Sequence, residues 1–258
     1  MAFVEVDGQQ LEYHLIPGQR SDRPTLVFLH EGLGSVALWR DFPASVAQAT
    51  GCRTLIWSRL GHGQSAPLAA ARKPSYLHAE ALQHLPPLLA ALAIERPVLI
   101  GHSDGGSIAL IHAAVFPERV AALVVLAPHV FVEEKALAGI ARATESYADS
   151  ERRQKLARYH RAPDAVFKAW HEIWLAPEFR AWDITACLAA IRCPVLAIQG
   201  EHDEYATMRQ IECIAEAVGA AAAGVELLKL ADCRHSPHRD QPQAVVEAIV
   251  HFVDRLAA

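Results

Sequence analysis

Two patterns of apolar residues alternate along most of the chain. Short apolar runs of about five residues are typical of strands buried on both faces. Longer segments repeat their apolar residues every three or four positions, as Leu82, Leu85, Leu88 and Leu92 do, which is typical of helices packed on one side. The expected strands are residues 25–29, 53–57, 97–101, 120–126, 194–198 and 225–230. The expected helices are residues 37–50, 75–93, 104–116, 206–218 and 241–256.

Residues 2–6 and 10–16 add an expected hairpin at the start, turning at Asp7-Gly8. Strands that alternate with helices form parallel sheets, because each helix carries the chain back across the sheet. The pattern therefore predicts an α/β fold: a mostly parallel twisted sheet of about eight strands with helices on both faces.

The alternation stops between residues 132 and 191, where the sequence is helical in character and rich in charges and aromatic rings. A stretch of about 60 residues is far longer than an ordinary connection between strands. We therefore expect a core domain of residues 1–131 and 192–258, with a helical cap inserted as residues 132–191.

The segment from Gly101 to Gly106 reads Gly-His-Ser-Asp-Gly-Gly and lies between an expected strand and an expected helix. A Gly-x-Ser-x-Gly on such a turn is the nucleophile elbow of serine hydrolases. Gly101 and Gly105 suit the sharp turn because they lack a Cβ atom. Ser103 would then lie at a helix N-terminus, where backbone N–H groups stabilise developing negative charge.

Composition narrows the class of protein. The chain has 258 residues, 52% of them hydrophobic, and a formal net charge of −5, without a long basic run. These values fit a globular protein, and they argue against nucleic acid and membranes as partners. We expect a small-molecule substrate and a monomer or homodimer.

No signal peptide is evident in residues 1–7, and no stretch reaches the ~20 apolar residues of a spanning helix. The five cysteines are odd in number and irregularly spaced, which predicts reduced thiols in a cytoplasmic protein. The chain has no phosphate-binding glycine loop and no clear metal-ligand spacing. We therefore expect no cofactor and no metal.

Five motifs in chain order resemble those of the α/β-hydrolase superfamily. They are the elbow and the segments His30–Gly34, Arg59–Ser65, Gly200–Asp203 and Cys233–Pro237. The resemblance covers nearly the whole chain, most loosely in the cap, and five matches in order are not a chance occurrence. It implies a catalytic triad of Ser103, Asp203 and His235, in the order that this fold uses.

The residues themselves support those roles. Asp203 and His235 each follow an expected strand, 32 residues apart, and would meet at the carboxyl edge of the sheet. His235 would remove the proton of the serine hydroxyl, and Asp203 would hold the imidazole. Glu201, Glu204 and His238 lie close by in the sequence as rivals.

The resemblance also implies an oxyanion hole formed by the N–H groups of Gly32 and Asp104. Glu31 departs from the pattern, because the superfamily usually has glycine there. A carboxylate pointing inward would oppose the developing negative charge, so we expect Glu31 to point away and to pair with a basic or backbone group.

Asp104 is a second departure, since the position after the serine is often apolar. The Ser-Asp-Gly-Gly sequence resembles that of the valacyclovir hydrolase group, enzymes that cleave amino-acid esters, which would make Asp104 a binding residue for a substrate ammonium. The alternative is that Asp104 stabilises the first turn of its helix. Further candidates for the substrate pocket are His129, Tyr147, Trp170 and Trp174.

The leading hypothesis is a serine hydrolase that cleaves an ester, thioester or lactone of a small organic acid through an acyl-enzyme. One alternative is a hydrolase of carbon–carbon bonds in ring-cleavage products, which uses a similar triad. Another is a ligand sensor without catalysis on the same fold, because fold does not determine function.

Overall fold

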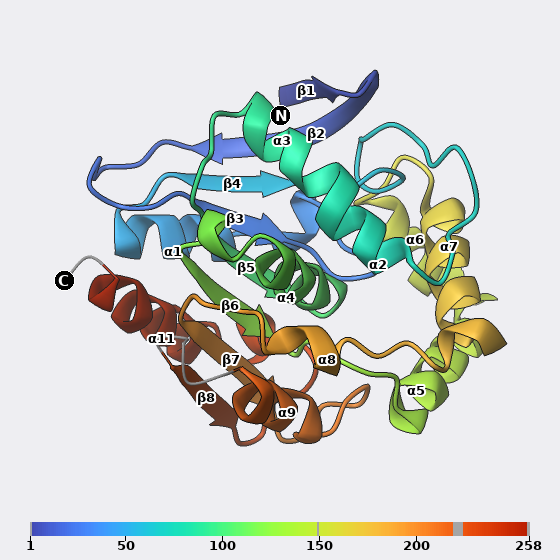
Figure 1. Ribbon diagram of the computed structural model, residues 1–258. Helices are drawn as coiled ribbons and strands as arrows, with labels where there is room; N and C mark the ends of the chain where they lie inside the picture. Colours follow the sequence, from blue (N-terminus) through green and yellow to red (C-terminus); the bar gives the residue numbers. More distant parts are fainter. Residues whose placement is uncertain (1, 149, 219–223, 257–258) are drawn as a thin grey trace.

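The computed structural model describes residues 2–148, 150–218 and 224–256 (Figure 1). Its strands form one eight-stranded sheet in the order β1-β2-β4-β3-β5-β6-β7-β8. Only β2 runs antiparallel to its two neighbours, and the other pairs are parallel. The expected α/β fold is therefore confirmed. The strands are β1 (Ala2–Val6), β2 (Gln9–Ile16), β3 (Leu26–Leu29), β4 (Thr54–Trp57), β5 (Val98–His102), β6 (Ala122–Leu126), β7 (Val195–Gly200) and β8 (Val225–Leu230).

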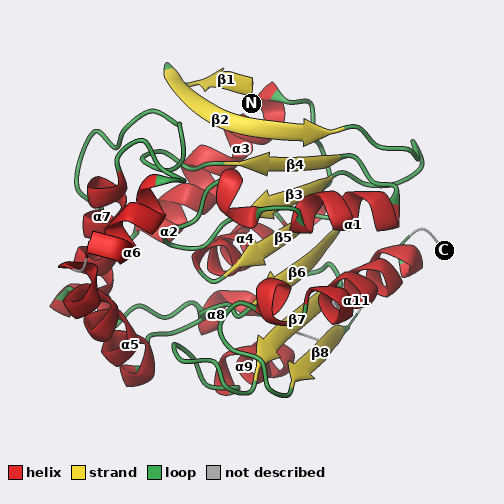
Figure 2. Ribbon diagram, turned by 180° about the vertical axis from the view of Figure 1, so that it is seen from behind, coloured by secondary structure: helices red, strands yellow, loops and turns green. Residues whose placement is uncertain are grey.

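Helices cover both faces of this sheet (Figures 1 and 2). One face carries α1 and α11, and the other carries α3, α4, α8 and α9. The helices are α1 (Phe42–Thr50), α2 (Tyr76–Ala79), α3 (Leu85–Ala91), α4 (Asp104–Val115), α5 (Glu134–Glu145), α6 (Ser150–Ala157), α7 (Pro163–Leu175), α8 (Thr185–Leu188), α9 (Arg209–Ala217), α10 (Pro237–Asp240) and α11 (Pro242–Arg255). Short 3₁₀ turns span Ala37–Trp39, Pro117–Arg119, Ser146–Ala148 and Pro177–Phe179.

Successive side chains of the central strands point to opposite faces of the sheet, so the hydrophobic core consists of two layers. In β5, Leu99 faces the layer under α4, whereas Val98 and Ile100 face the layer under α1 and α11. All three side chains are fully buried. This two-sided burial explains why the central strands read as unbroken apolar runs.

The expected single helix over residues 75–93 is wrong in its middle. A π-helical turn over Glu80–His84 separates α2 from α3, and the Leu85 N–H donates to the carbonyl oxygen of Glu80. Pro86 and Pro87 follow directly and have no N–H to donate. The regular ladder therefore cannot continue, and the backbone widens by one residue before α3 begins.

The long connection between β6 and β7 contains α5, α6, α7 and α8. Helices α5, α6 and α7 lie beyond the carboxyl ends of the parallel strands (Figure 1, right). Ligands of open α/β sheets bind at that edge. Over the described ranges, no helix combines the length and apolar character that crossing a membrane requires.

Candidate active site

Ser103 lies on the tight turn between β5 and α4, with φ +52° and ψ −116°. A residue that has a side chain rarely adopts a positive φ, so this backbone conformation is strained. The neighbouring glycines are required by contact: a Cβ atom on Gly101 would overlap the Gly105 carbonyl, and one on Gly105 would overlap the Leu29 carbonyl. The strand, the helix and the glycines together fix the position of the serine hydroxyl.

Ser103, His235 and Asp203 form a continuous chain of hydrogen bonds. His235 Nε2 lies 3.0 Å from Ser103 Oγ, and its Nδ1 lies 2.9 Å from each carboxylate oxygen of Asp203. Asp203 is fully buried and also accepts the N–H groups of Tyr205 and Ala206, at 2.8 and 3.1 Å. The structure thus joins three side chains that are up to 132 residues apart in the sequence.

The surroundings of Asp203 and His235 favour the charged form of each side chain. Burial would lower the pKa of His235, but the nearby Asp203 carboxylate raises it overall. Burial would raise the pKa of Asp203, but His235 and the backbone N–H groups lower it overall. The carboxylate therefore remains ionised and stabilises the imidazolium that forms when His235 accepts a proton.

The rival residues occupy other places. Glu201 is exposed, while Glu204 accepts hydrogen bonds from the backbone N–H of His235 and from Arg234 Nη2, both at 3.1 Å. The ring of His238 is buried against Trp39, and burial lowers its pKa to about 3. None of these three side chains contacts Ser103 in the structure described.

Histidines hold the loops around the site through backbone contacts. His30 Nδ1 lies 2.7 Å from the carbonyl oxygen of Glu31, and His30 Nε2 accepts the N–H of Arg59 at 3.0 Å. His62 Nε2 lies 3.1 Å from the Gly32 carbonyl oxygen, and His102 Nε2 lies 2.7 Å from that of His235. Burial lowers the pKa of each of the three, so they serve as neutral hydrogen-bonding groups.

Of the two expected oxyanion-hole residues, Asp104 directly follows Ser103 in the chain, and Gly32 lines the same cavity as Ser103. Asp104 is the first residue of α4, so its N–H has no acceptor inside that helix. Gly32 lines the cavity in front of Ser103, and in the described part of the chain its N–H has no protein acceptor. The Leu33 N–H is occupied, since it donates to Glu31 Oε2. The N–H groups of Gly32 and Asp104 therefore have no acceptor among the described residues.

The Asp104 side chain points away from the substrate side, contrary to the expectation that it binds an ammonium group. It is fully buried and accepts hydrogen bonds from Tyr76 Oη at 2.9 Å and from Trp174 Nε1 at 3.3 Å. Arg59 and Arg72 approach the same carboxylate at 3.4 and 3.9 Å. Two buried guanidinium groups need a counter-charge, and Asp104 supplies it.

Ser103 opens into a cavity of about 230 Å³. Of the expected pocket residues, His129, Trp170 and Trp174 line it, but Tyr147 does not. The Tyr147 ring instead packs on Phe167, with the two ring centroids 3.6 Å apart. The remaining lining residues are Glu31, Gly32, Leu33, His102, Ala136, Ile140, Glu204, Tyr205, His235 and Ser236.

Sequence reasoning did not identify Ala136, Ile140, Glu204 and Tyr205 as lining residues. Ala136 and Ile140 are four residues apart on α5 and so share one face of that helix. Glu204 and Tyr205 directly follow Asp203, and this adjacency to an expected site residue could have identified them as lining residues.

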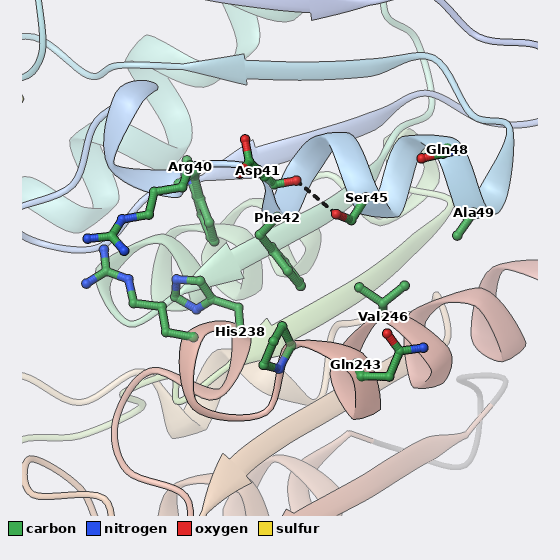
Figure 3. A pocket seen from close by; sticks show the side chains of 12 residues that line it. Arg40, Asp41, Phe42, Ser45, Gln48, Ala49, His238, Gln243 and Val246 are labelled. Carbon is green, nitrogen blue, oxygen red and sulfur yellow. Dashed lines mark hydrogen bonds between the residues drawn. The ribbon is translucent and has the colours of Figure 1, made fainter.

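A larger hollow of about 740 Å³ lies elsewhere, between α1 and the helices α10 and α11 (Figure 3). Side chains from α1, such as Phe42 and Ser45, and from α11, such as Gln243 and Val246, line it. None of the triad residues does. We therefore assign the candidate active site to the smaller cavity. No cluster of metal-ligating side chains was found within the described ranges.

Similar proteins of known sequence include a peptidase and a synthase. The chain is 32% identical over 113 residues to a proline iminopeptidase of Lactobacillus helveticus, which covers 43% of this chain and 38% of that protein. Matches to several curated relatives, including this one, span only 36–41% of the relative's own length. A 26% identical match to 2-succinyl-6-hydroxy-2,4-cyclohexadiene-1-carboxylate synthase of Enterobacter sp. (strain 638) covers 89% of this chain and 92% of that protein.

Solved structures share the fold. The enol-lactonase from Burkholderia xenovorans LB400 superposes with a TM-score of 0.76 over 98% of this chain and 100% of that chain, at 19% identity. Residues 24–169 match the family described as alpha/beta hydrolase fold, and these residues include the elbow and the oxyanion loop. The chain therefore belongs to the α/β-hydrolase fold family.

Proposed function

We propose that the protein is a serine hydrolase that cleaves esters, thioesters or lactones of small organic acids through an acyl-enzyme. The observation that carries the proposal is the unbroken chain from Asp203 through His235 to Ser103, which ends in a cavity beside two free N–H donors. A hydroxyl so placed is activated, and the charge that develops on the substrate oxygen is stabilised.

Each step uses groups already described. Ser103 Oγ attacks the acyl carbon while His235 Nε2 takes its proton, and the N–H groups of Gly32 and Asp104 bind the oxyanion. His235 then returns the proton to the leaving group, and the acyl-enzyme remains. A water molecule, deprotonated by His235, attacks the acyl carbon, and the collapse of the second intermediate frees Ser103 and the acid.

Cavity volume supports a small substrate. The cavity in front of Ser103 has a volume of about 230 Å³. The size of the cavity therefore supports a substrate with a small acyl group. We also propose that residues 132–191 act as a cap on the core of residues 1–131 and 192–258. Helices α5 and α7 supply Ala136, Ile140, Trp170 and Trp174 to the cavity wall.

The test is turnover and active-site labelling. The purified protein should hydrolyse p-nitrophenyl acetate and react with a fluorophosphonate at Ser103. Ser103→Ala should abolish labelling and lower kcat by up to ~10⁶-fold. Undiminished hydrolysis by this variant would overturn the assignment of the nucleophile. A protein that binds esters without cleaving them would favour the ligand-sensor alternative.

A further inference from the structure

The wall of the catalytic cavity combines acidic side chains with aromatic rings. Glu31 and Glu204 line it together with Trp170, Trp174 and Tyr205. Among the described residues that line the cavity there is no lysine or arginine. Carboxylates attract cations through charge, and aromatic faces attract them through the ring quadrupole. The cavity wall is therefore complementary to a positively charged group.

Glu31 lines the catalytic cavity, so the expectation that it points away is wrong, although it does pair with a backbone group as expected. Its Oε2 atom accepts the N–H of Leu33, and its Oε1 atom has no hydrogen-bond partner among the described residues. Burial raises the pKa of Glu31, so the charged form lacks full compensation within the protein. Arg239 acts on it only through space, since its Nη2 atom donates to the carbonyl oxygen of Leu38.

The other carboxylates near the site already have partners. Glu204 accepts Arg234 Nη2 and the N–H of His235, both at 3.1 Å. Asp203 is bound to His235, and Asp104 is enclosed by Tyr76, Trp174 and two arginines without lining the cavity. Glu31 alone thus combines a free oxygen with a position in the wall.

We propose that Glu31 binds a cationic nitrogen of the substrate, so that the protein prefers small esters that carry an ammonium group. The proposal rests on the proposed hydrolase function and names its substrate class. Glu31 precedes Gly32, and the Trp170 indole packs directly on Gly32. Carboxylate and aromatic ring therefore belong to the wall of the same cavity, which is where a cation would meet them.

Two matched substrate pairs test the preference. Alanine benzyl ester and propanoic acid benzyl ester differ by an ammonium group in the acyl part. Acetylcholine and 3,3-dimethylbutyl acetate have the same shape and differ by a charge in the alcohol part. We expect kcat/KM for the charged member of at least one pair to exceed that of the neutral member by about tenfold or more, chiefly through KM.

Glu31→Gln removes the charge and keeps an oxygen that can accept the N–H of Leu33. The preference should fall to about twofold or less in this variant. Glu201→Gln is the matched control, because Glu201 is exposed and does not line the cavity. It should keep the preference of the parent protein. Equal kcat/KM within both pairs, or a preference that survives Glu31→Gln, would overturn the proposal.

A binding measurement separates this proposal from the hydrolase function. Calorimetric titration with n-butylammonium and with 1-butanol needs no turnover. The parent should bind the ammonium about tenfold more tightly than the alcohol, and Glu31→Gln should bind both alike. Hydrolysis of neutral esters without this difference would leave the hydrolase intact and refute the role of Glu31. The difference without any ester hydrolysis would support Glu31 and refute the hydrolase.

Discussion

His235 is subject to two opposing influences whose balance sets the working pH. Burial disfavours the imidazolium, the Asp203 carboxylate favours it, and the pKa of His235 is raised overall. Only the neutral ring can accept the proton of Ser103. The value of kcat/KM should therefore be low in acid and rise to a plateau, with an inflection above the ordinary histidine value of about 6.5. A pH profile of neutral-ester hydrolysis checks this, and an inflection well below that value would contradict it.

Asp203→Asn should lower both the rate and the apparent pKa. The amide carries no charge to stabilise the imidazolium, and it can hold the ring in the wrong tautomer, which costs about 10⁴-fold in kcat in comparable triads. Measured pH profiles of the variant should show the inflection shifted to lower pH. Glu201→Gln, next to it on the surface, should stay within a few-fold of the parent. Equal damage from both variants would mean that the acid is misassigned.

Asp104 has a structural role that its position beside the nucleophile conceals. Its carboxylate offsets two buried guanidinium groups, whose side chains are 1% and 4% exposed. Asp104→Asn keeps the shape and removes the carboxylate that pairs with both guanidinium groups, so the free energy of unfolding should fall by about 3–5 kcal/mol. Asp22→Asn breaks the exposed pair with Arg20, which solvent screens, and should leave the free energy of unfolding nearly unchanged. Urea unfolding of both variants checks this, and equal losses would refute the role.

The sequence predicted which residues carry chemistry better than where their side chains point. The direction of the Asp104 carboxylate depends on Arg59 and Arg72, which reach it from a distant loop, and no local pattern contains that information. Tyr147 is an aromatic residue of the expected cap and was therefore a candidate for the substrate pocket. Its stacking on Phe167 follows from how two helical segments meet, which the pattern of a single chain does not show.

At the scale of elements, the strands and the elbow were predictable because their causes are local. An apolar run becomes a central strand wherever both faces are covered, and glycine spacing permits the turn at Ser103. The interruption between α2 and α3 was predictable in principle. Leucines at helical spacing dominated the pattern, although Pro86 and Pro87 stand inside it and cannot donate to the helix ladder.

Helix α7 packs against the expected oxyanion loop through Trp170 and Gly32. A Cβ atom on Gly32 would overlap the Trp170 indole. Gly32→Ala should therefore displace the loop or the ring and lower kcat/KM, by up to the 10²–10³-fold that loss of one oxyanion donor costs. Trp170→Ala removes the obstacle, so the double variant should be more active than Gly32→Ala alone. Kinetics of the four proteins check this, and strictly additive losses would contradict the contact.

At the scale of the whole molecule, the strained turn at Ser103 affects the stability of the entire fold. A residue held at φ +52° with a side chain costs about 1–3 kcal/mol. Ser103→Gly relieves that strain, and the extra freedom of glycine in the unfolded chain offsets about 0.5–1 kcal/mol of the gain. Ser103→Gly should therefore unfold at higher urea than Ser103→Ala, although both are inactive. Equal midpoints would show that the turn is not strained.

The expected stability of Ser103→Gly matters for directed evolution of this protein. A library of this chain selected only for survival after heating would enrich Ser103→Gly, since glycine at the proposed nucleophile position relieves the strain of the turn. Directed evolution of this protein therefore needs turnover and heat resistance to be selected together in every round.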